Sequence, residues 1–308
     1  MSTASTVPVT HDLEGDDAAE TLRRCGIRHL LRDSFKRFRF ADGFSHSRAL
    51  AFQFVLTLLP ALIAIVGLAN ELGQQKFSDI ISQTFRDLAP GPAGEVLTSA
   101  IEQGSDGGGG TALFVGLAAA IIAGTTAMGQ IERGANRIYG VERDRPTLAK
   151  YTRAAILAAT AGLATILALV ILVAGREIGD AVKDVTGLSD TVDTVWNIAR
   201  WPLSAALVVG AIALLFERSP NRDQPSPSWL ALGSGIAVAL WFAFTALLAA
   251  YISLSKDFGE TYGPLAGVIG LMLWALLTAL ALFLGLAIAA QLEAVRAGSP
   301  SPGEYPED

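Results

Sequence analysis

Residues 49–69 of this 308-residue chain read ALAFQFVLTLLPALIAIVGLA, a stretch of 21 residues without a charged side chain. A helix of that length spans about 30 Å, which is the thickness of the hydrocarbon core of a bilayer. Only Gln53 and Thr57 interrupt its apolar surface, whereas a helix in a soluble domain normally keeps a polar face. The stretch therefore predicts a transmembrane helix.

The composition of the whole chain agrees with this reading. Hydrophobic residues make up 51% of the sequence and charged residues 17%, against about 25% charged residues in ordinary soluble domains. The single cysteine, Cys25, excludes an internal disulfide, and His11, His29 and His46 all precede the first span. No zinc site, other metal site or cofactor is predicted from this set.

Five further apolar segments predict an all-α polytopic membrane domain of six helices over residues 27–293. The predicted spans are 49–69, 111–130, 154–175, 201–216, 229–254 and 264–292. The segments on one side of these spans hold 17 lysines and arginines, and those on the other side hold 6. The positive-inside rule then places both termini in the cytoplasm. Residues 1–26 and 294–308 are polar and are predicted to be disordered, with no cleavable signal peptide.

Residues 27–40 predict an amphipathic helix ahead of the first span. Its apolar residues recur at helical spacing, and the remaining faces carry Arg28, Arg32, Lys36, Arg37 and Arg39. Such a helix can lie in the membrane interface with its basic residues among the headgroups. The same pattern also suits a helix packed on the protein's own cytoplasmic face. Asp42-Gly43 then predicts a break in the helix.

The first outer loop predicts a helical cap on the extracytoplasmic side. A helical repeat of apolar residues ends at Pro90-Gly91-Pro92, and a second short helix is expected over residues 95–102. The repeat consists of Phe77, Ile80, Ile81, Phe85 and Leu88.

Small residues recur every four positions in three of the predicted spans. Such rows let helices approach closely, although an alanine-rich chain contains some by chance. The rows are Gly116, Ala120 and Gly124; Ala154, Ala158 and Gly162; and Ala281, Gly285 and Ala289.

The most polar segment next to a span is QIERGANRIYGVERDRP, residues 130–146. Arg133, Asn136, Arg137 and Tyr139 form a candidate contact site here for an anionic lipid headgroup or an anionic solute, because arginine binds phosphate and carboxylate bidentately. The alternative is that the arginines only extend to the headgroups and fix the topology.

Gln53, Thr57 and Pro60 in the first span, with Tyr262 at the outer mouth, are candidate residues of a path or gate. Pro60 frees a backbone carbonyl and can kink its helix, which makes it either a gate or simply part of a shaped helix. Ionisable side chains are nearly absent from the predicted spans. Because ion-coupled pumps usually hold one there, uncoupled movement is expected.

Three passages together resemble the YihY/BrkB family of bacterial inner-membrane proteins, which is also grouped with YhjD. They are ALAFQFVLTLLP at 49–60, NRIYGVERDRP at 136–146, and the last span with Tyr262-Gly263 at its start and Glu293 at its end. The resemblance implies a six-helix envelope protein with cytoplasmic termini, which acts in envelope integrity or moves a lipid or small solute. Some members of that family carry the label ribonuclease BN.

Three functions follow as hypotheses. The first is a transporter or lipid translocator whose partners are membrane lipids, and the second is a non-transporting membrane scaffold for envelope partners. The third is a tRNA-processing ribonuclease, which the residues do not support because no extramembrane segment is long enough to build a metal-dependent nuclease domain. We therefore predict neither an enzyme nor a nucleic-acid partner. Oligomer formation stays open.

Overall fold

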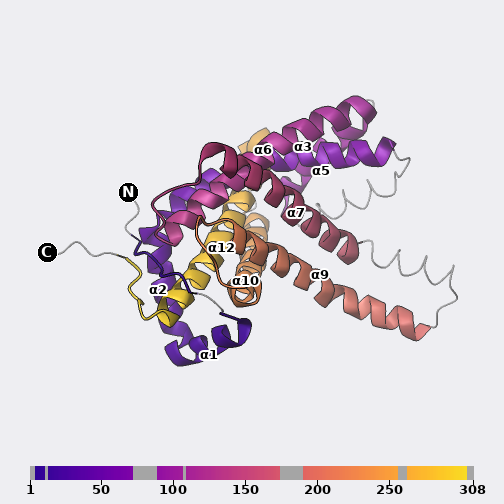
Figure 1. The fold of residues 1–308 in the computed structure, drawn as a ribbon. Helices are drawn as coiled ribbons and strands as arrows, with labels where there is room; N and C mark the ends of the chain where they lie inside the picture. The colour runs from indigo at the N-terminus through magenta and orange to yellow at the C-terminus, as the bar shows by residue number, and fades with distance from the viewer. Residues whose placement is uncertain are drawn as a thin grey trace.

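The computed structural model describes residues 4–10, 13–71, 89–106, 109–173, 190–255 and 262–303, and these ranges are helical apart from short connections (Figure 1). No strand occurs within them, so the all-α prediction is confirmed. The predicted helical repeat over residues 77–88 lies outside the described residues. The helices are α1 (Gly15–Cys25), α2 (Ile27–Phe40), α3 (Gly43–Glu71), α5 (Pro92–Asp106), α6 (Gly109–Ile138), α7 (Thr147–Val173), α9 (Asp190–Arg218), α10 (Pro227–Leu254), the 3-10 turn η1 (Gly263–Leu265) and α12 (Ala266–Arg296).

Five of these helices are long and apolar enough to cross a membrane. They cover the predicted first, second, fourth, fifth and sixth spans. The predicted third span, 154–175, falls on α7, which is not one of the five, so a total of six spans stays a prediction. The five segments are Gly43–Leu68, Leu113–Ile138, Thr194–Arg218, Pro227–Leu254 and Ala266–Arg296.

The first and last described segments, residues 4–10 and 297–303, lie at one end of the helix bundle (Figure 1). We call this the terminal end; it consists of residues 4–10, α1, α2 and the segments 139–146, 219–226 and 297–303. At the opposite end, Gly67 near the close of α3 packs on Leu113 near the start of α6. The connection between α2 and α3 is short because Asp42 adopts a left-handed backbone with φ of 58°. The predicted break at Asp42-Gly43 is thus confirmed.

Helix α12 lies at the centre of the bundle. In the most apolar 18-residue stretch of α12, 61% of the residues are buried. The corresponding stretches of the other four candidate spans are 11–28% buried. Two reciprocal hydrogen bonds join it to α10: Trp241 Nε1 donates to Thr278 Oγ1 at 3.0 Å, and Trp274 Nε1 donates to Thr245 Oγ1 at 3.2 Å. Polar contacts of this kind contribute roughly 0.6 kcal/mol each between membrane helices.

Glycines permit the closest helix contacts. An added Cβ on Gly233 of α10 would lie 2.7 Å from Gly285 O of α12, and one on Gly116 of α6 would lie 3.1 Å from Pro60 O of α3. The predicted rows through Gly116 and Gly285 therefore are helix contacts. Gly162, at the end of the second predicted row, makes no such close contact, because an added Cβ there would meet nothing within 4 Å.

The described parts of the chain ends, residues 4–10, 13–26 and 294–303, differ from the predicted disorder. Residues 15–25 form α1, which Arg296 holds through ion pairs with Asp17 at 2.9 Å and Glu20 at 3.5 Å. Residues 297–303 fold back onto α2, where Gly303 contacts the ring of Phe40. Composition indicates disorder for polar segments, but it does not show that the partners for these side chains lie elsewhere in the chain.

Helix α2 confirms the predicted helix, and its apolar residues divide between two faces. Leu30 and Phe38 are buried in the main core, and α2 packs against α12. Ile27, Leu31 and Phe35 are exposed by 46–59%. One face of α2 therefore packs on the protein itself, and contact of the other face with the membrane interface stays a prediction.

Candidate polar site at the terminal end

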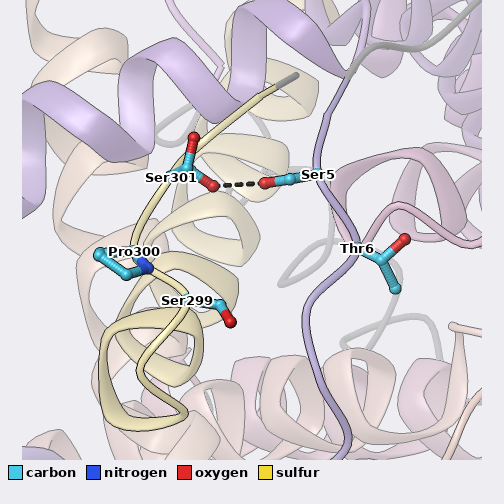
Figure 2. A pocket seen from close by; sticks show the side chains of 5 residues that line it. All are labelled: Ser5, Thr6, Ser299, Pro300 and Ser301. Atoms are coloured by element: carbon cyan, nitrogen blue, oxygen red, sulfur yellow. Dashed lines mark hydrogen bonds between the residues drawn. The ribbon is translucent and has the colours of Figure 1, made fainter. Parts of the chain in front are cut away.

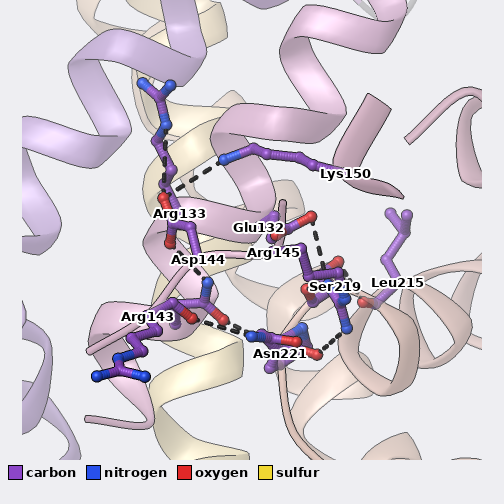
Figure 3. A network of polar contacts seen from close by, with 11 residues as sticks. Glu132, Arg133, Arg143, Asp144, Arg145, Lys150, Leu215, Ser219 and Asn221 are labelled. Atoms are coloured by element: carbon purple, nitrogen blue, oxygen red, sulfur yellow. Dashed lines mark hydrogen bonds and ion pairs between the residues drawn. The ribbon is translucent and has the colours of Figure 1, made fainter. Parts of the chain in front are cut away.

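The segment after α6 is fixed to the segment after α9 by an arginine (Figure 3). Arg145 donates from Nη1 to Ser219 O at 2.7 Å and from Nη2 to Pro220 O at 2.5 Å. The same guanidinium lies 3.3 Å from Glu132, and both side chains are more than 90% buried. Two carbonyls and one carboxylate thus satisfy a charge that would otherwise be costly to bury.

Asn136 bridges the same two segments. Its Nδ2 donates to Asp144 Oδ1 at 2.8 Å, and its Oδ1 accepts the backbone N–H of Asn221 at 2.7 Å. Lys150 Nζ lies 3.5 Å from Asp144 Oδ2. Partial burial alone would raise the pKa of Asp144, but the Asn136 hydrogen bond and the Lys150 charge outweigh it, and the pKa lies below its usual value. Asp144 is thus a carboxylate at neutral pH.

A second buried ion pair lies where α12 ends. Arg222 Nη2 lies 2.6 Å from Glu293 Oε1, with side-chain exposures of 6% and 0%. The hydroxyl of Thr10 donates to the same oxygen at 2.7 Å, and the Arg222 guanidinium stacks 4.7 Å from the centre of the Tyr139 ring. Burial raises the pKa of the Tyr139 phenol well above its usual value, so it stays neutral.

Arg37 joins four parts of the chain. Its Nε donates to Gln291 Oε1 at 2.7 Å, and its Nη1 donates to Ser5 O at 2.9 Å and Ile138 O at 3.2 Å. Nη2 donates to Ser301 O at 3.2 Å. Burial lowers the pKa of Arg37 to about 10, which leaves the guanidinium charged at neutral pH. Arg37 is completely buried, so its predicted place on a basic interfacial surface is wrong.

The other basic residues of α2 are placed as a surface helix requires. Arg28, Arg32 and Arg39 are exposed. Lys36 is partly exposed and pairs with Asp33 at 3.3 Å. Contact of these residues with lipid headgroups stays a prediction.

The four residues of the predicted anion site do not share one surface. Arg133 is 56% exposed and lies 4.0 Å from Asp144, and Arg137 is partly exposed close to His46. Asn136 and Tyr139 are completely buried. Their predicted contact with a bound anion is wrong, because both side chains serve the packing of the terminal end.

The structure describes all four candidate path residues, and their role as a path or gate stays a prediction. The Thr57 hydroxyl donates to Gln53 O at 2.7 Å in its own helix, and Gly116 of α6 packs against Pro60 O. Helix α6 therefore covers the side of α3 on which the Pro60 carbonyl lies. Tyr262 lies at the opposite end of the bundle from the terminal end, before η1, and is 40% exposed.

Sequence reasoning missed the buried role of Arg37, Arg222, Gln291 and Glu293. A signal was present for the last two, because they are the polar residues that end an otherwise apolar helix. The partners of Arg37, and the partner Glu293 of Arg222, lie 32 to 264 residues away in sequence, a separation that no local pattern reports.

The five apolar helices and the polar terminal end define a multi-pass helical membrane protein. The chain belongs to the family described as Virulence factor BrkB, which matches residues 34–306. The family expected from the sequence is thereby confirmed. The ribonuclease-like protein YfkH of Bacillus subtilis (strain 168) is 29% identical over 255 residues, which cover 83% of this chain and 92% of YfkH. No solved structure matches the chain.

Proposed function

We propose that this protein lies in the cell inner membrane with both termini in the cytoplasm and moves an anionic lipid or small anionic solute without ion coupling. Through this activity it contributes to envelope integrity. The observation that carries the proposal is the placement of Arg133, whose side chain is 56% exposed within the last turns of a candidate membrane span. A guanidinium at that depth meets the phosphate layer of the bilayer.

The neighbouring carboxylates are held by other residues. Glu132 pairs with Arg145, and Asp144 accepts from Asn136 and lies near Lys150. At 4.0 Å, the Arg133–Asp144 pair is at the limit of an ion pair, and exposed pairs contribute only about 0–1 kcal/mol. An incoming phosphate or carboxylate can therefore compete for Arg133. Arg137, four residues on, lies on a neighbouring position of the same helix face.

Six spans are part of the proposal. The first and last described segments meet, since Ser5 Oγ donates to Ser301 O, and a chain with both of these segments on one side of a membrane crosses it an even number of times between them. Helix α7 supplies the sixth crossing. It runs antiparallel to α6, because Gly129 lies beside Lys150 while Gly124 lies beside Ala158.

We also propose that the exposed stripe of α2, made of Ile27, Leu31 and Phe35, lies in the cytoplasmic membrane interface. The stripe continues to Phe44 at the start of α3, whose ring lies 6.4 Å from that of Phe35. Exposed Arg28 and Arg32 beside it suit anionic headgroups. Burying this stripe would restrain the first span at a fixed depth.

A membrane scaffold is the second candidate function. It is favoured by the packing of α6 against Pro60 O, which covers the predicted path on that side. A ribonuclease activity rests only on the name of YfkH, and our proposal contains neither an enzymatic step nor a nucleic-acid partner. Metal-dependent trimming of tRNA by the purified protein would overturn that part.

Mass spectrometry of what co-purifies with the solubilised protein tests the proposal. The wild type is compared with the variant Arg133→Gln, Arg137→Gln and with Arg143→Gln, which removes an exposed arginine from the neighbouring loop. We expect a defined anionic lipid or solute that is lost only in the double variant. Equal bulk lipid in all three samples would favour the scaffold.

A further inference from the structure

The buried Arg222–Glu293 pair is covered by an extended N-terminal segment. Residues 4–10, which we call the strap, have no regular secondary structure. Hydrogen bonds attach the strap to the terminal end along its length. Val7 N donates to Tyr139 O at 3.1 Å, Thr6 Oγ1 donates to Gly140 O at 3.1 Å, and Arg222 Nη2 donates to Pro8 O at 3.2 Å.

The outer side of the strap is poorly covered. Figure 2 shows an open pocket between the strap and the C-terminal segment, lined by Ser5, Thr6, Ser299, Pro300 and Ser301. Among the described residues of the strap, only Val7, which is 2% exposed, is a buried member of the main core. Its attachment therefore depends on Val7 and on hydrogen bonds, among them those that Arg37 donates to Ser5, and water can replace the hydrogen bonds.

The polar atoms beneath the strap are incompletely satisfied. Among the residues described, Arg222 Nη1, Glu293 Oε2 and the Tyr139 hydroxyl are buried without a hydrogen-bond partner. Gln224 lies beside that hydroxyl, and both polar atoms of its amide also lack partners there. Buried polar groups in this state are costly, and access of water would satisfy all of them.

We propose that the strap is a lid that opens to give solvent access to the Arg222–Glu293 pair at the end of α12. Opening breaks the Thr10 and Pro8 bonds and exposes Val7, and hydration of the unsatisfied atoms offsets part of this cost. The proposal goes beyond the proposed function, because it requires no bound lipid or solute. It assigns the cytoplasmic end of the central helix a gated, polar opening.

Thiol labelling tests this lid directly. In a Cys25→Ser background, Val7→Cys places a thiol under the strap, and Ala279→Cys places one in the core of α12, where the residue is completely buried. We expect Cys at position 7 to react with a maleimide at least about tenfold faster than Cys at position 279. Equal, slow reaction of the two thiols would overturn the proposal.

A second variant separates opening of the lid from general unfolding. Thr10→Val removes the 2.7 Å hydrogen bond to Glu293. Loss of a hydrogen bond to a charged group should shift the equilibrium between the closed and the open lid by about tenfold or more. Labelling at position 7 should therefore accelerate about tenfold, while labelling at position 279 stays unchanged. Thr10→Ser keeps the hydroxyl and should match the parent. An unchanged rate at position 7 in Thr10→Val would also contradict the lid.

Discussion

At the scale of single residues, the buried ion pairs determine the stability of the terminal end. Arg145→Gln leaves Glu132 buried without its cation, and breaking a buried pair in this way costs about 3–5 kcal/mol. We expect a clear fall in the melting temperature of the detergent-solubilised protein. Arg143→Gln, two residues earlier and exposed, should change stability by less than about 0.5 kcal/mol. Similar melting temperatures for the two variants would contradict the assignment of Arg145 as the residue that joins the segments.

Asp144 predicts a dependence of stability on pH. Its pKa is lower in the folded protein than in the unfolded chain. Its contribution is therefore complete above the ordinary aspartate pKa of about 4 and is lost as pH falls through the lower, folded value. Because the side chain is 34% exposed, the effect should be small. When the pH falls from 5 to 3, the melting temperature of Asp144→Asn should therefore fall by less than that of the wild type. An identical pH profile would contradict this role.

At the scale of elements, helix positions were more predictable from sequence than helix faces. The period of apolar residues predicted α2, and the length of apolar runs predicted five spans, because both signals are local. The roles of Arg37, Asn136 and Tyr139 were missed because their environment depends on distant segments. The sequence singled out the string 136–146 as part of a candidate anion site, but its Asn136 and Tyr139 are completely buried and stabilise the packing.

Glycine contacts give a prediction for α10 and α12. Gly233→Ala would bring a Cβ to 2.7 Å from Gly285 O and 2.8 Å from the Ala289 side chain, and such overpacking costs about 1–3 kcal/mol. Gly162→Ala meets nothing within 4 Å and should be neutral or stabilising by up to about 1 kcal/mol, because alanine favours helix. Unfolding in SDS titrations measures both. If Gly233→Ala were as stable as Gly162→Ala, the close contact of these helices would be wrong.

At the scale of the whole molecule, the meeting of both chain ends predicts the topology. Cys25 lies at the terminal end, and Tyr262 lies at the opposite end. In intact cells a membrane-impermeant thiol reagent should therefore label Tyr262→Cys in a Cys25→Ser background, and should label native Cys25 only after lysis. The positive-inside count supplies the direction, with the terminal end in the cytoplasm. Labelling of Cys25 in intact cells would reverse the proposed orientation.

The proposed function is movement of an anionic molecule across the membrane with the help of Arg133 and Arg137. The most direct measurement is the flip rate of a fluorescent phosphatidylglycerol in sealed proteoliposomes, followed by dithionite quenching. We predict that the wild type and Arg143→Gln accelerate flipping over empty liposomes, and that Arg133→Gln, Arg137→Gln abolishes the acceleration at equal reconstitution. The same liposomes can be tested for release of a small anionic solute such as trapped phosphate. If the correctly folded wild type accelerated neither lipid flipping nor phosphate release over empty liposomes, transport would be contradicted and the scaffold function favoured.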